Sequence, residues 1–263
     1  MRLSARRTAA LGVVQGVCEL LPVSSSAHVS LVPALLGWPE ADLPPTRRRI
    51  VEVALHGGTA VALPWAVRDA LARAPRSPAF HILVAAPPVV VGAVASDLIE
   101  RRAAHRRAIA VGLVVGAAAL VAGDRTVFSR RDATEKDHAR EAGAADGLAL
   151  GLAQAAALFP GVSRRGATLA AARARGYDRA AASDLSWAAG IPVMLAAAAR
   201  GAVVSAKRGE LRTDAPALAA GAAAAAVTVA ALSPARPAID RVPYAAWAAW
   251  RSALAVAAGT LGR

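Results

Sequence analysis

The sequence predicts an all-α integral membrane protein with six transmembrane helices and two re-entrant helical hairpins, arranged as an inverted-topology repeat. Of its 263 residues, 56% are hydrophobic, and they occur in runs that approach the roughly 20 residues a membrane-spanning helix requires. Two of the apolar segments are interrupted by short polar breaks. Most arginines lie between the apolar runs, as basic residues that flank membrane spans do.

The first hydrophobic segment, residues 8–36, is interrupted at Pro22 and the following run of serines. Neither apolar piece is long enough to span a bilayer comfortably by itself. Irregular backbone at membrane depth is tolerated only where it is buried in protein or lines a wet cavity. We therefore expect residues 8–36 to form a re-entrant hairpin.

The rest of the chain divides into two halves of one membrane domain, residues 1–263. The first half, 1–122, continues with predicted spans at 50–67, 79–98 and 108–122. Residues 123–147 are the most polar stretch and are expected to be an extramembrane connector. The second half, 148–263, begins with a second broken segment at 148–172 and continues with predicted spans at 184–200, 215–232 and 243–261.

The two broken segments resemble each other. Three residues of the first recur in the second at the same spacing: Gly12, Gln15 and Ser24 correspond to Gly151, Gln154 and Ser163. Matched broken segments in two halves indicate an inverted-repeat membrane protein with its site at the repeat interface.

Glu19 points to a functional site. An ionisable side chain at membrane depth costs several kcal/mol unless it is paired or wetted, so it marks function by default. The second break, residues 160–168, contains Arg164 and is the expected partner of the first.

The formal net charge of +13 does not indicate nucleic-acid binding, because the basic residues are spread among the loops instead of clustered on one surface. Since nearly every loop is basic, charge does not orient the chain in the membrane.

The two breaks have the chemistry of a phosphate site. A helix that restarts after a break exposes unpaired N–H groups and a partial positive charge, which bind anions. Hydroxyl groups lie at or near both restarts, at Ser24, Ser25, Ser26 and Ser163. The planar guanidinium of Arg164 can bind phosphate oxygens bidentately. If the hairpins meet, these groups converge on one anionic cavity.

Glu19 would repel a phosphate unless a cation lay between them, so we expect a divalent cation, Mg²⁺ or Ca²⁺. Gln15 lies one helical turn earlier and offers a neutral oxygen, which makes Gln15 and Glu19 the candidate metal ligands. His28 is a candidate acid or base, and a serine is a candidate nucleophile. Some of these residues also have a structural interpretation: His28 as a hydrogen-bonded residue near a helix end, and the serines as helix caps. Thr168, in the second break, could likewise bond within its own helix.

Two motifs carry a family resemblance. Residues 12–28, GVVQGVCELLPVSSSAH, resemble the (E/Q)-x-x-x-E and P-x-S-S-x-G-H signatures of the undecaprenyl-diphosphate phosphatase family, the bacitracin-resistance type. Residues 160–168, PGVSRRGAT, resemble its P-G-x-S-R-S-G-A-T signature. Two long motifs in the right order make this a specific match.

The resemblance implies a multi-pass enzyme of the bacterial plasma membrane that hydrolyses undecaprenyl (C55) diphosphate to undecaprenyl phosphate and inorganic phosphate. Such an enzyme recycles the lipid carrier for cell-wall peptidoglycan synthesis and confers bacitracin resistance. Its site would face the extracytoplasmic side and use a divalent cation. Its expected partners are the polyprenyl-diphosphate substrate and membrane lipids, without nucleic acid, and a homodimer is one option for its assembly.

Carried over by position, the resemblance also assigns roles. Gln15 and Glu19 would serve the metal and the diphosphate, and His28 would assist proton transfer. Ser25 and Ser163 would be nucleophiles or phosphate ligands, and Arg164 and Thr168 would hold phosphate. The full substrate-binding set comprises Gln15, Ser24, Ser26, Arg164, Arg165, Gly166 and Thr168.

Two residues depart from the family pattern. Ala27 stands where glycine is usual, so a positive φ there would strain the backbone. Arg165 stands where a second serine is usual, and its cation either tightens product binding or points away.

Two other functions compete with the phosphatase. A transporter or flippase of lipid-linked phosphates would also use broken helices in inverted repeats. Lipid phosphatases that resemble soluble acid phosphatases are disfavoured, because no histidine with a following aspartate lies downstream of Ser163.

Overall fold

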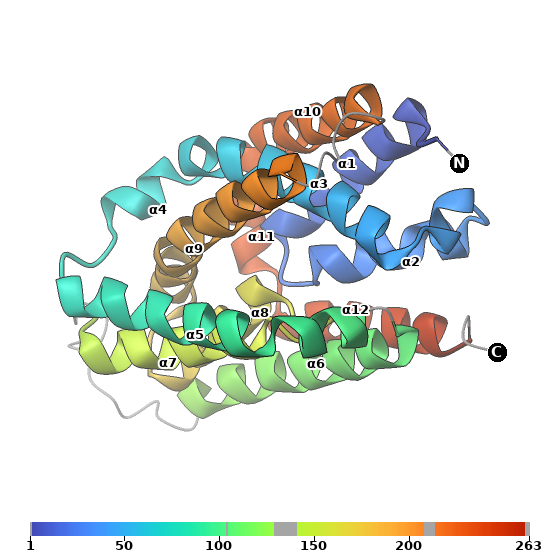
Figure 1. Ribbon diagram of the computed structural model, residues 1–263. Coiled ribbons are helices and arrows are strands. Elements are labelled where there is room, and N and C mark those ends of the chain that lie inside the picture. Colours follow the sequence, from blue (N-terminus) through green and yellow to red (C-terminus); the bar gives the residue numbers. More distant parts are fainter. Residues whose placement is uncertain (1, 104, 129–140, 208–213, 261–263) are drawn as a thin grey trace. The chain divides into compact units, whose positions relative to one another are not determined.

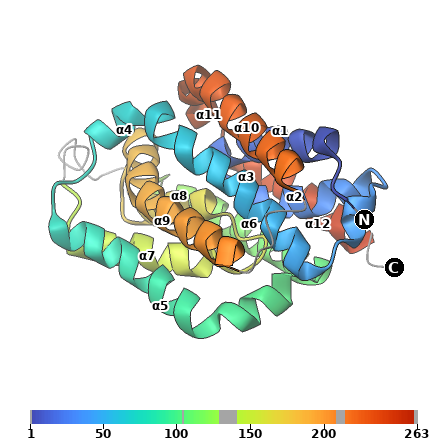
Figure 2. The ribbon, with the colours of Figure 1, turned by 45° about the horizontal axis from the view of Figure 1, so that its top comes forward.

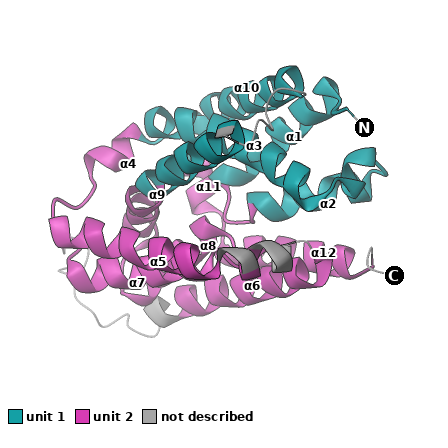
Figure 3. Cartoon of the chain, in the orientation of Figure 1, with its two compact units in different colours: residues 1–20, 25–67, 191–236 teal, residues 21–24, 68–190, 237–263 magenta. Residues whose placement is uncertain are grey.

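The computed structural model describes residues 2–103, 105–128, 141–207 and 214–260, and every regular element in these ranges is helical (Figure 1). The predicted all-α class is therefore confirmed. The chain forms two compact units, each of which takes segments from both halves of the sequence (Figure 3). Unit 1 comprises Met1–Leu20, Ser25–Val67 and Ile191–Arg236. Unit 2 comprises Leu21–Ser24, Arg68–Gly190 and Pro237–Arg263.

Unit 1 contains α1 (Ala5–Leu20), α2 (Ser25–Leu35), η1 (Pro39–Asp42), α3 (Pro45–Ala66), the C-terminal part of α9 (Arg179–Lys207), α10 (Ala215–Leu232) and η3 (Ser233–Ala235). Helix α10 packs against α1 and α3 (Figure 2). A Cβ atom at Gly12 would overlap the carbonyl oxygen of Gly221, and one at Gly58 would overlap that of Ala222. Small residues thus let these helix backbones touch, as in many membrane helix pairs.

Unit 2 contains α4 (Arg68–Ala72), α5 (Pro78–Ala103), α6 (Arg106–Phe128), α7 (Ala144–Ala156), α8 (Arg164–Ala174), the N-terminal part of α9, most of α11 (Arg236–Arg241) and α12 (Tyr244–Thr260). Helix α5 lies beside α7, and α6 lies beside α8 and α12 (Figure 1). Its core is a cluster of buried apolar side chains that includes Phe80, Leu120, Leu150, Leu169 and Leu185.

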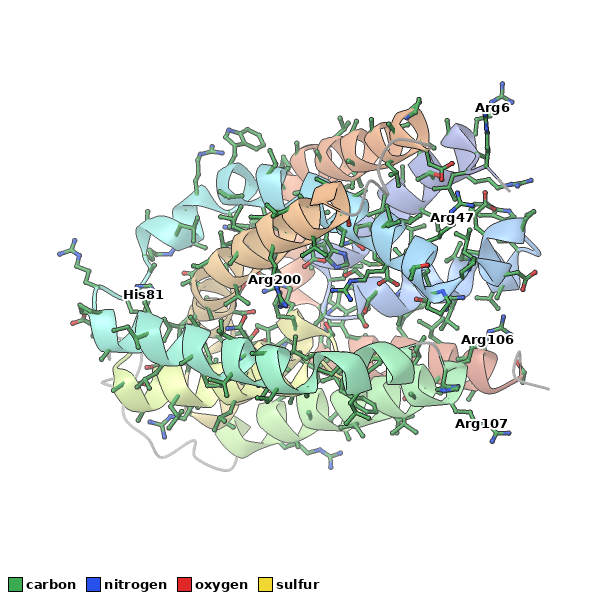
Figure 4. The ribbon with its side chains drawn as sticks, viewed as in Figure 1. Arg6, Arg47, His81, Arg106, Arg107 and Arg200 are labelled. Atoms are coloured by element: carbon green, nitrogen blue, oxygen red, sulfur yellow. The ribbon has the colours of Figure 1, made fainter. Side chains whose placement is uncertain are left out.

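Among the described residues, four helical segments are long and apolar enough to cross a membrane: Pro78–Ala95, Arg106–Arg125, Arg179–Ala206 and Ala215–Arg241. Large apolar side chains project from such helices, with Val94 81% exposed and Val227 66% exposed. Exposed apolar surface of this kind is expected on helices that contact lipid. Arg106 and Arg107, at the start of α6, extend away from the ribbon (Figure 4). The protein is a helical membrane protein.

Both predicted breaks separate two short helices. Helix α1 ends at Leu20 and α2 begins at Ser25, whereas α7 ends at Ala156 and α8 begins at Arg164. Helices α5, α6 and α9 extend beyond the predicted spans at both ends, because an apolar window ends at the first charged residues but the helix continues through them. Helix α10 has the predicted bounds, 215–232. Helix α6 reaches Phe128 and α7 begins at Ala144, so both enter the predicted connector; residues 129–140 of that connector lie outside the described residues.

Gln154 repairs a gap in the hydrogen bonding of α5. Pro87 and Pro88 lie inside this helix. Because Pro88 has no N–H, the carbonyl of Val84, four residues earlier, lacks its helical donor. Nε2 of Gln154, on α7, donates to this carbonyl at 3.2 Å. The glutamine therefore joins α7 to α5 at the point where the proline opens the helix.

We expect Gln154→Leu to destabilise the protein by about 1–3 kcal/mol, because it leaves the buried Val84 carbonyl without a donor. Pro88→Ala restores a backbone donor, so the same substitution should cost much less in that background. Thermal unfolding in detergent of the wild-type protein, the two single variants and the double variant measures this coupling. An equal loss in both backgrounds would show that Gln154 does not compensate for Pro88.

Candidate active site

The first break is a tight turn with one strained residue. Ser24 has a φ of 73°, which only it adopts among the described residues other than glycine. A positive φ in a residue other than glycine destabilises the folded protein by about 1–3 kcal/mol, and residues strained in this way cluster at functional sites. Ala27 lies within α2 and does not adopt the positive φ that would strain it. The turn that needs positive φ is completed before the helix starts, so alanine fits where glycine is usual.

Glu19 is the centre of a polar cluster in unit 1. Glu19 lies in the last turn of α1 and is buried, with 7% of its surface exposed. Oε2 accepts hydrogen bonds from Nε2 of Gln15 at 3.0 Å and from Oγ of Ser25 at 2.8 Å. Gln15 reaches Glu19 because residues four apart share a helix face. Ser25 reaches it because the tight turn returns the chain to the end of α1.

His28 and Ser25 lie on one face of α2, three residues apart in its first turn. His28 is 6% exposed. The first break thus places an imidazole on the same helix face as the hydroxyl that contacts Glu19. Ser26, which is partly exposed, follows Ser25 in the same turn.

Gln15 and the Glu19 carboxylate suit a cation. Gln15 is fully buried, and its Oε1 has no hydrogen-bond partner although Nε2 is bound to Glu19. A buried amide oxygen without a donor, beside a carboxylate, is a donor set that hard divalent cations accept. The described residues contain no group of three or more His, Cys, Asp or Glu side chains with metal-site geometry. The remaining ligands of an ion here would have to be substrate or water oxygens.

The second break is pressed against α6. Gly161 has a φ of +90°, and a Cβ atom there would overlap the carbonyl oxygen of Ile109. A Cβ atom at Gly112 would overlap the carbonyl oxygen of Pro160. Only glycine allows both the positive φ and this close backbone approach. The position of the second break is therefore fixed by α6.

Ser163 and Gly166 form the N-terminal cap of α8. Oγ of Ser163 accepts the N–H of Gly166 at 3.2 Å, in the usual geometry of an N-cap serine. One lone pair of this hydroxyl and the amide of Gly166 therefore serve the helix.

Arg164 and Arg165, the first residues of α8, have different surroundings. Arg164 lies against α9, where a Cβ atom at Gly190 would overlap its Nη1. Arg165 has a buried side chain that donates to Oδ1 of Asp240 at 2.7 Å and to Oγ of Ser183 at 3.2 Å. Its guanidinium also stacks 3.9 Å from the ring centre of Trp187. The additional arginine is thus held by α9 and α11.

Thr168 joins α8 to α9. Its hydroxyl lies 2.7 Å from Oγ of Ser186 and donates to the carbonyls of Arg164 and Arg165 within its own helix. Thr168 is fully buried, and the two bonds within α8 are those of a structural threonine.

Three residues near the breaks were missed by the sequence analysis. Gly190 and Asp240 could not be found, since their contacts with Arg164 and Arg165 depend on the fold. Arg251, a fully buried arginine in the middle of predicted span 243–261, had the same signal that identified Glu19.

These features define a helical membrane protein with an acidic, hydroxyl-rich helix break and a basic helix break. The chain belongs to the family of bacitracin resistance protein BacA, whose family model matches residues 8–257.

Three curated proteins that are similar to this chain are all named undecaprenyl-diphosphatase. An undecaprenyl-diphosphatase of Geobacter metallireducens is 34% identical over 72% of this chain and 72% of its own length. Proteins of the same name from Desulforudis audaxviator and Alcanivorax borkumensis are 35% and 37% identical, each over 71% of this chain and 72% of theirs.

Proposed function

We propose that this protein hydrolyses undecaprenyl diphosphate to undecaprenyl phosphate and inorganic phosphate. The observation that carries the proposal is the 2.8 Å hydrogen bond from the Ser25 hydroxyl to the buried Glu19 carboxylate. A hydroxyl in contact with a base is the arrangement of an activated nucleophile. Membership of the BacA family and the shared name of its relatives support the substrate. The product sustains the lipid carrier of cell-wall synthesis, which accounts for bacitracin resistance.

Ser25 is the nucleophile in this proposal. Glu19 takes the Ser25 proton as Oγ forms a bond to the terminal phosphorus. The bond from that phosphorus to the bridging oxygen breaks, and undecaprenyl phosphate leaves with a proton from His28. Water, deprotonated by His28, then attacks the seryl phosphate. The bond from phosphorus to Ser25 Oγ breaks, Glu19 returns its proton to this oxygen, and inorganic phosphate leaves.

A divalent cation, Mg²⁺ or Ca²⁺, would be held by Glu19 and Gln15 and would neutralise charge on the diphosphate. Arg164 binds the phosphate oxygens in the same proposal. Ser24, Ser26, Gly166 and Thr168 shape the two breaks around it, and Arg165 supports the basic break through Asp240.

The proposed membrane arrangement has six spans and two re-entrant pairs, α1–α2 and α7–α8, in an inverted repeat. Helices α3 and α12 are the two spans beyond the four that length and composition identify. The protein would lie in the bacterial plasma membrane among its lipids, with the site on the extracytoplasmic side. A homodimer is the assembly to test by mass measurement in detergent.

Phosphate release by the purified protein in detergent tests the function. With undecaprenyl diphosphate and Mg²⁺ or Ca²⁺ we expect stoichiometric release, and EDTA should abolish it. Absence of release under all of these conditions, together with transfer of the lipid between the leaflets of vesicles, would support the transporter instead.

The two candidate nucleophiles are separated by substitution. We expect Ser25→Ala to lower kcat about 100-fold, because water can occupy the position of the hydroxyl and still be deprotonated by Glu19. Ser163→Ala removes an N-cap and should cost about 0.5–2 kcal/mol of stability with kcat changed only a few-fold. Turnover and unfolding midpoints measure both. A larger loss of kcat in Ser163→Ala than in Ser25→Ala would exchange the two roles.

A further inference from the structure

The strongest unexplained feature of unit 2 is the environment of Arg251. This arginine lies in the middle of α12 and is fully buried. Its guanidinium donates to four backbone carbonyls: Leu113 through Nε at 3.2 Å, Pro22 through Nη1 at 3.1 Å, and Gly112 and Gly161 through Nη2 at 3.3 and 3.0 Å. Within the described part of the chain, no carboxylate forms an ion pair with it.

The four carbonyls belong to three separate segments. Two are in α6, one is in the first break and one is in the second break. Pro22 lies between Glu19 and Ser25 in the chain, and Gly161 lies just before Ser163 and Arg164. One side chain therefore binds the loops from which both groups of proposed functional residues extend.

The surroundings of the guanidinium are fitted to it. A Cβ atom at Gly116 would overlap Nη2 of Arg251. A Cβ atom at Gly166 would lie 2.9 Å from Nη1 and 3.3 Å from the Pro22 carbonyl oxygen. Glycines of α6 and α8 thus leave space for the side chain and for the first break beside it.

Packing alone does not account for this arginine. A buried cation needs compensation, and an apolar side chain would fill the same volume without that need. Guanidinium is suited to join several carbonyls because its five donors form a rigid planar fork, whereas lysine has one compact ammonium group.

We propose that Arg251 is a positioning residue that fixes the first and second breaks relative to each other for phosphoryl transfer. This inference rests on the proposed phosphatase function. Catalysis of this kind depends on alignment, and a displacement of about 1 Å can lower the rate about 100-fold. Loss of the fork should therefore lower kcat by at least about 10-fold and change KM much less, since substrate groups still bind while the reacting groups are misaligned.

Two substitutions test this with matched controls. Arg251→Lys keeps the charge but loses the fork. Gly116→Ala keeps the arginine and favours the helix, but displaces Nη2. Arg173→Lys is the control for loss of a buried arginine, because Arg173 binds Asp124 and the Tyr177 carbonyl away from both breaks. Gly259→Ala is the control for an added methyl group in α12, where no atom lies within 4 Å.

The readout is kcat and KM per folded molecule, with the folded fraction taken from size-exclusion chromatography and thermal unfolding. We expect kcat to fall in both test variants and to stay near the wild-type value in both controls. Unchanged kcat in folded Arg251→Lys and Gly116→Ala would overturn the proposal and leave Arg251 a purely structural residue. If Arg251→Lys does not fold, Gly116→Ala decides. Absence of phosphate release by the wild-type protein would instead refute the proposed function.

Discussion

Glu19→Gln is expected to reduce kcat by about 1,000-fold or more while the protein stays folded. Glutamine keeps the shape of the side chain and can still contact Gln15 and Ser25. It cannot accept the Ser25 proton, and general base catalysis contributes about 100- to 10,000-fold. It also removes the negative charge with which Glu19 would hold a divalent cation. Phosphate release from undecaprenyl diphosphate, measured over a range of Mg²⁺ concentrations, gives the size of the effect.

Glu40→Gln is the matched control. Glu40 is another buried carboxylate of unit 1, and its partner is Arg7, at 3.5 Å. Since it lies in η1 and not at a break, its loss should affect stability and leave kcat near the wild-type value. Glu19→Gln with near wild-type turnover would remove Glu19 from the mechanism and leave the contact with Ser25 as a structural hydrogen bond.

The helical class and the two breaks could be predicted because their causes are local. Long apolar runs, and the prolines and serines that interrupt them, are visible in a single sequence. The helix ends were harder to predict. Helix α9 runs from Arg179 to Lys207, whereas the apolar residues predicted a span of only 184–200. The two compact units were not predictable, because they join segments from both halves of the chain.

The candidate site shows where local patterns stop being informative. The repeat pairs Gln15 with Gln154, but Gln15 contacts the Glu19 carboxylate and Gln154 contacts the Val84 carbonyl. The second contact exists because Pro88, distant in sequence, has no N–H. Similarly, the choice between a functional and a structural Thr168 depended on Ser186, which only the packing of α8 against α9 brings near.

The family pattern was informative about position and less so about environment. Arg165 stands where a serine is usual, and the direction of its side chain depends on whether a carboxylate lies nearby. Asp240, Ser183 and Trp187 provide the hydrogen bonds and stacking that hold it. An arginine at this position is accommodated by partners that no motif around residue 165 includes.

Arg164→Ala should lower kcat/KM about 1,000-fold, because removing an arginine that stabilises charge in phosphoryl transfer typically costs 10³–10⁵-fold. Arg175→Ala, at the other end of α8, is the control: Arg175 pairs with Asp146 at 2.8 Å and should affect stability alone. Steady-state phosphate release measures both. Near wild-type kcat/KM for Arg164→Ala would show that the basic break does not bind the diphosphate.

Gly190→Ala extends the test of Arg164 without removing any functional group. The added methyl group would overlap Nη1 of Arg164, so the guanidinium must move from its place on α9. We expect kcat/KM to fall in the same direction as in Arg164→Ala but less, by about 10-fold or more. Gly57→Ala, where no atom lies within 4 Å of the new methyl group, should have no effect. In the double variant Gly190→Ala with Arg164→Ala, the glycine substitution should cause no further loss, since its only proposed effect is on the arginine. An additive loss would mean that Gly190 acts on turnover by another route.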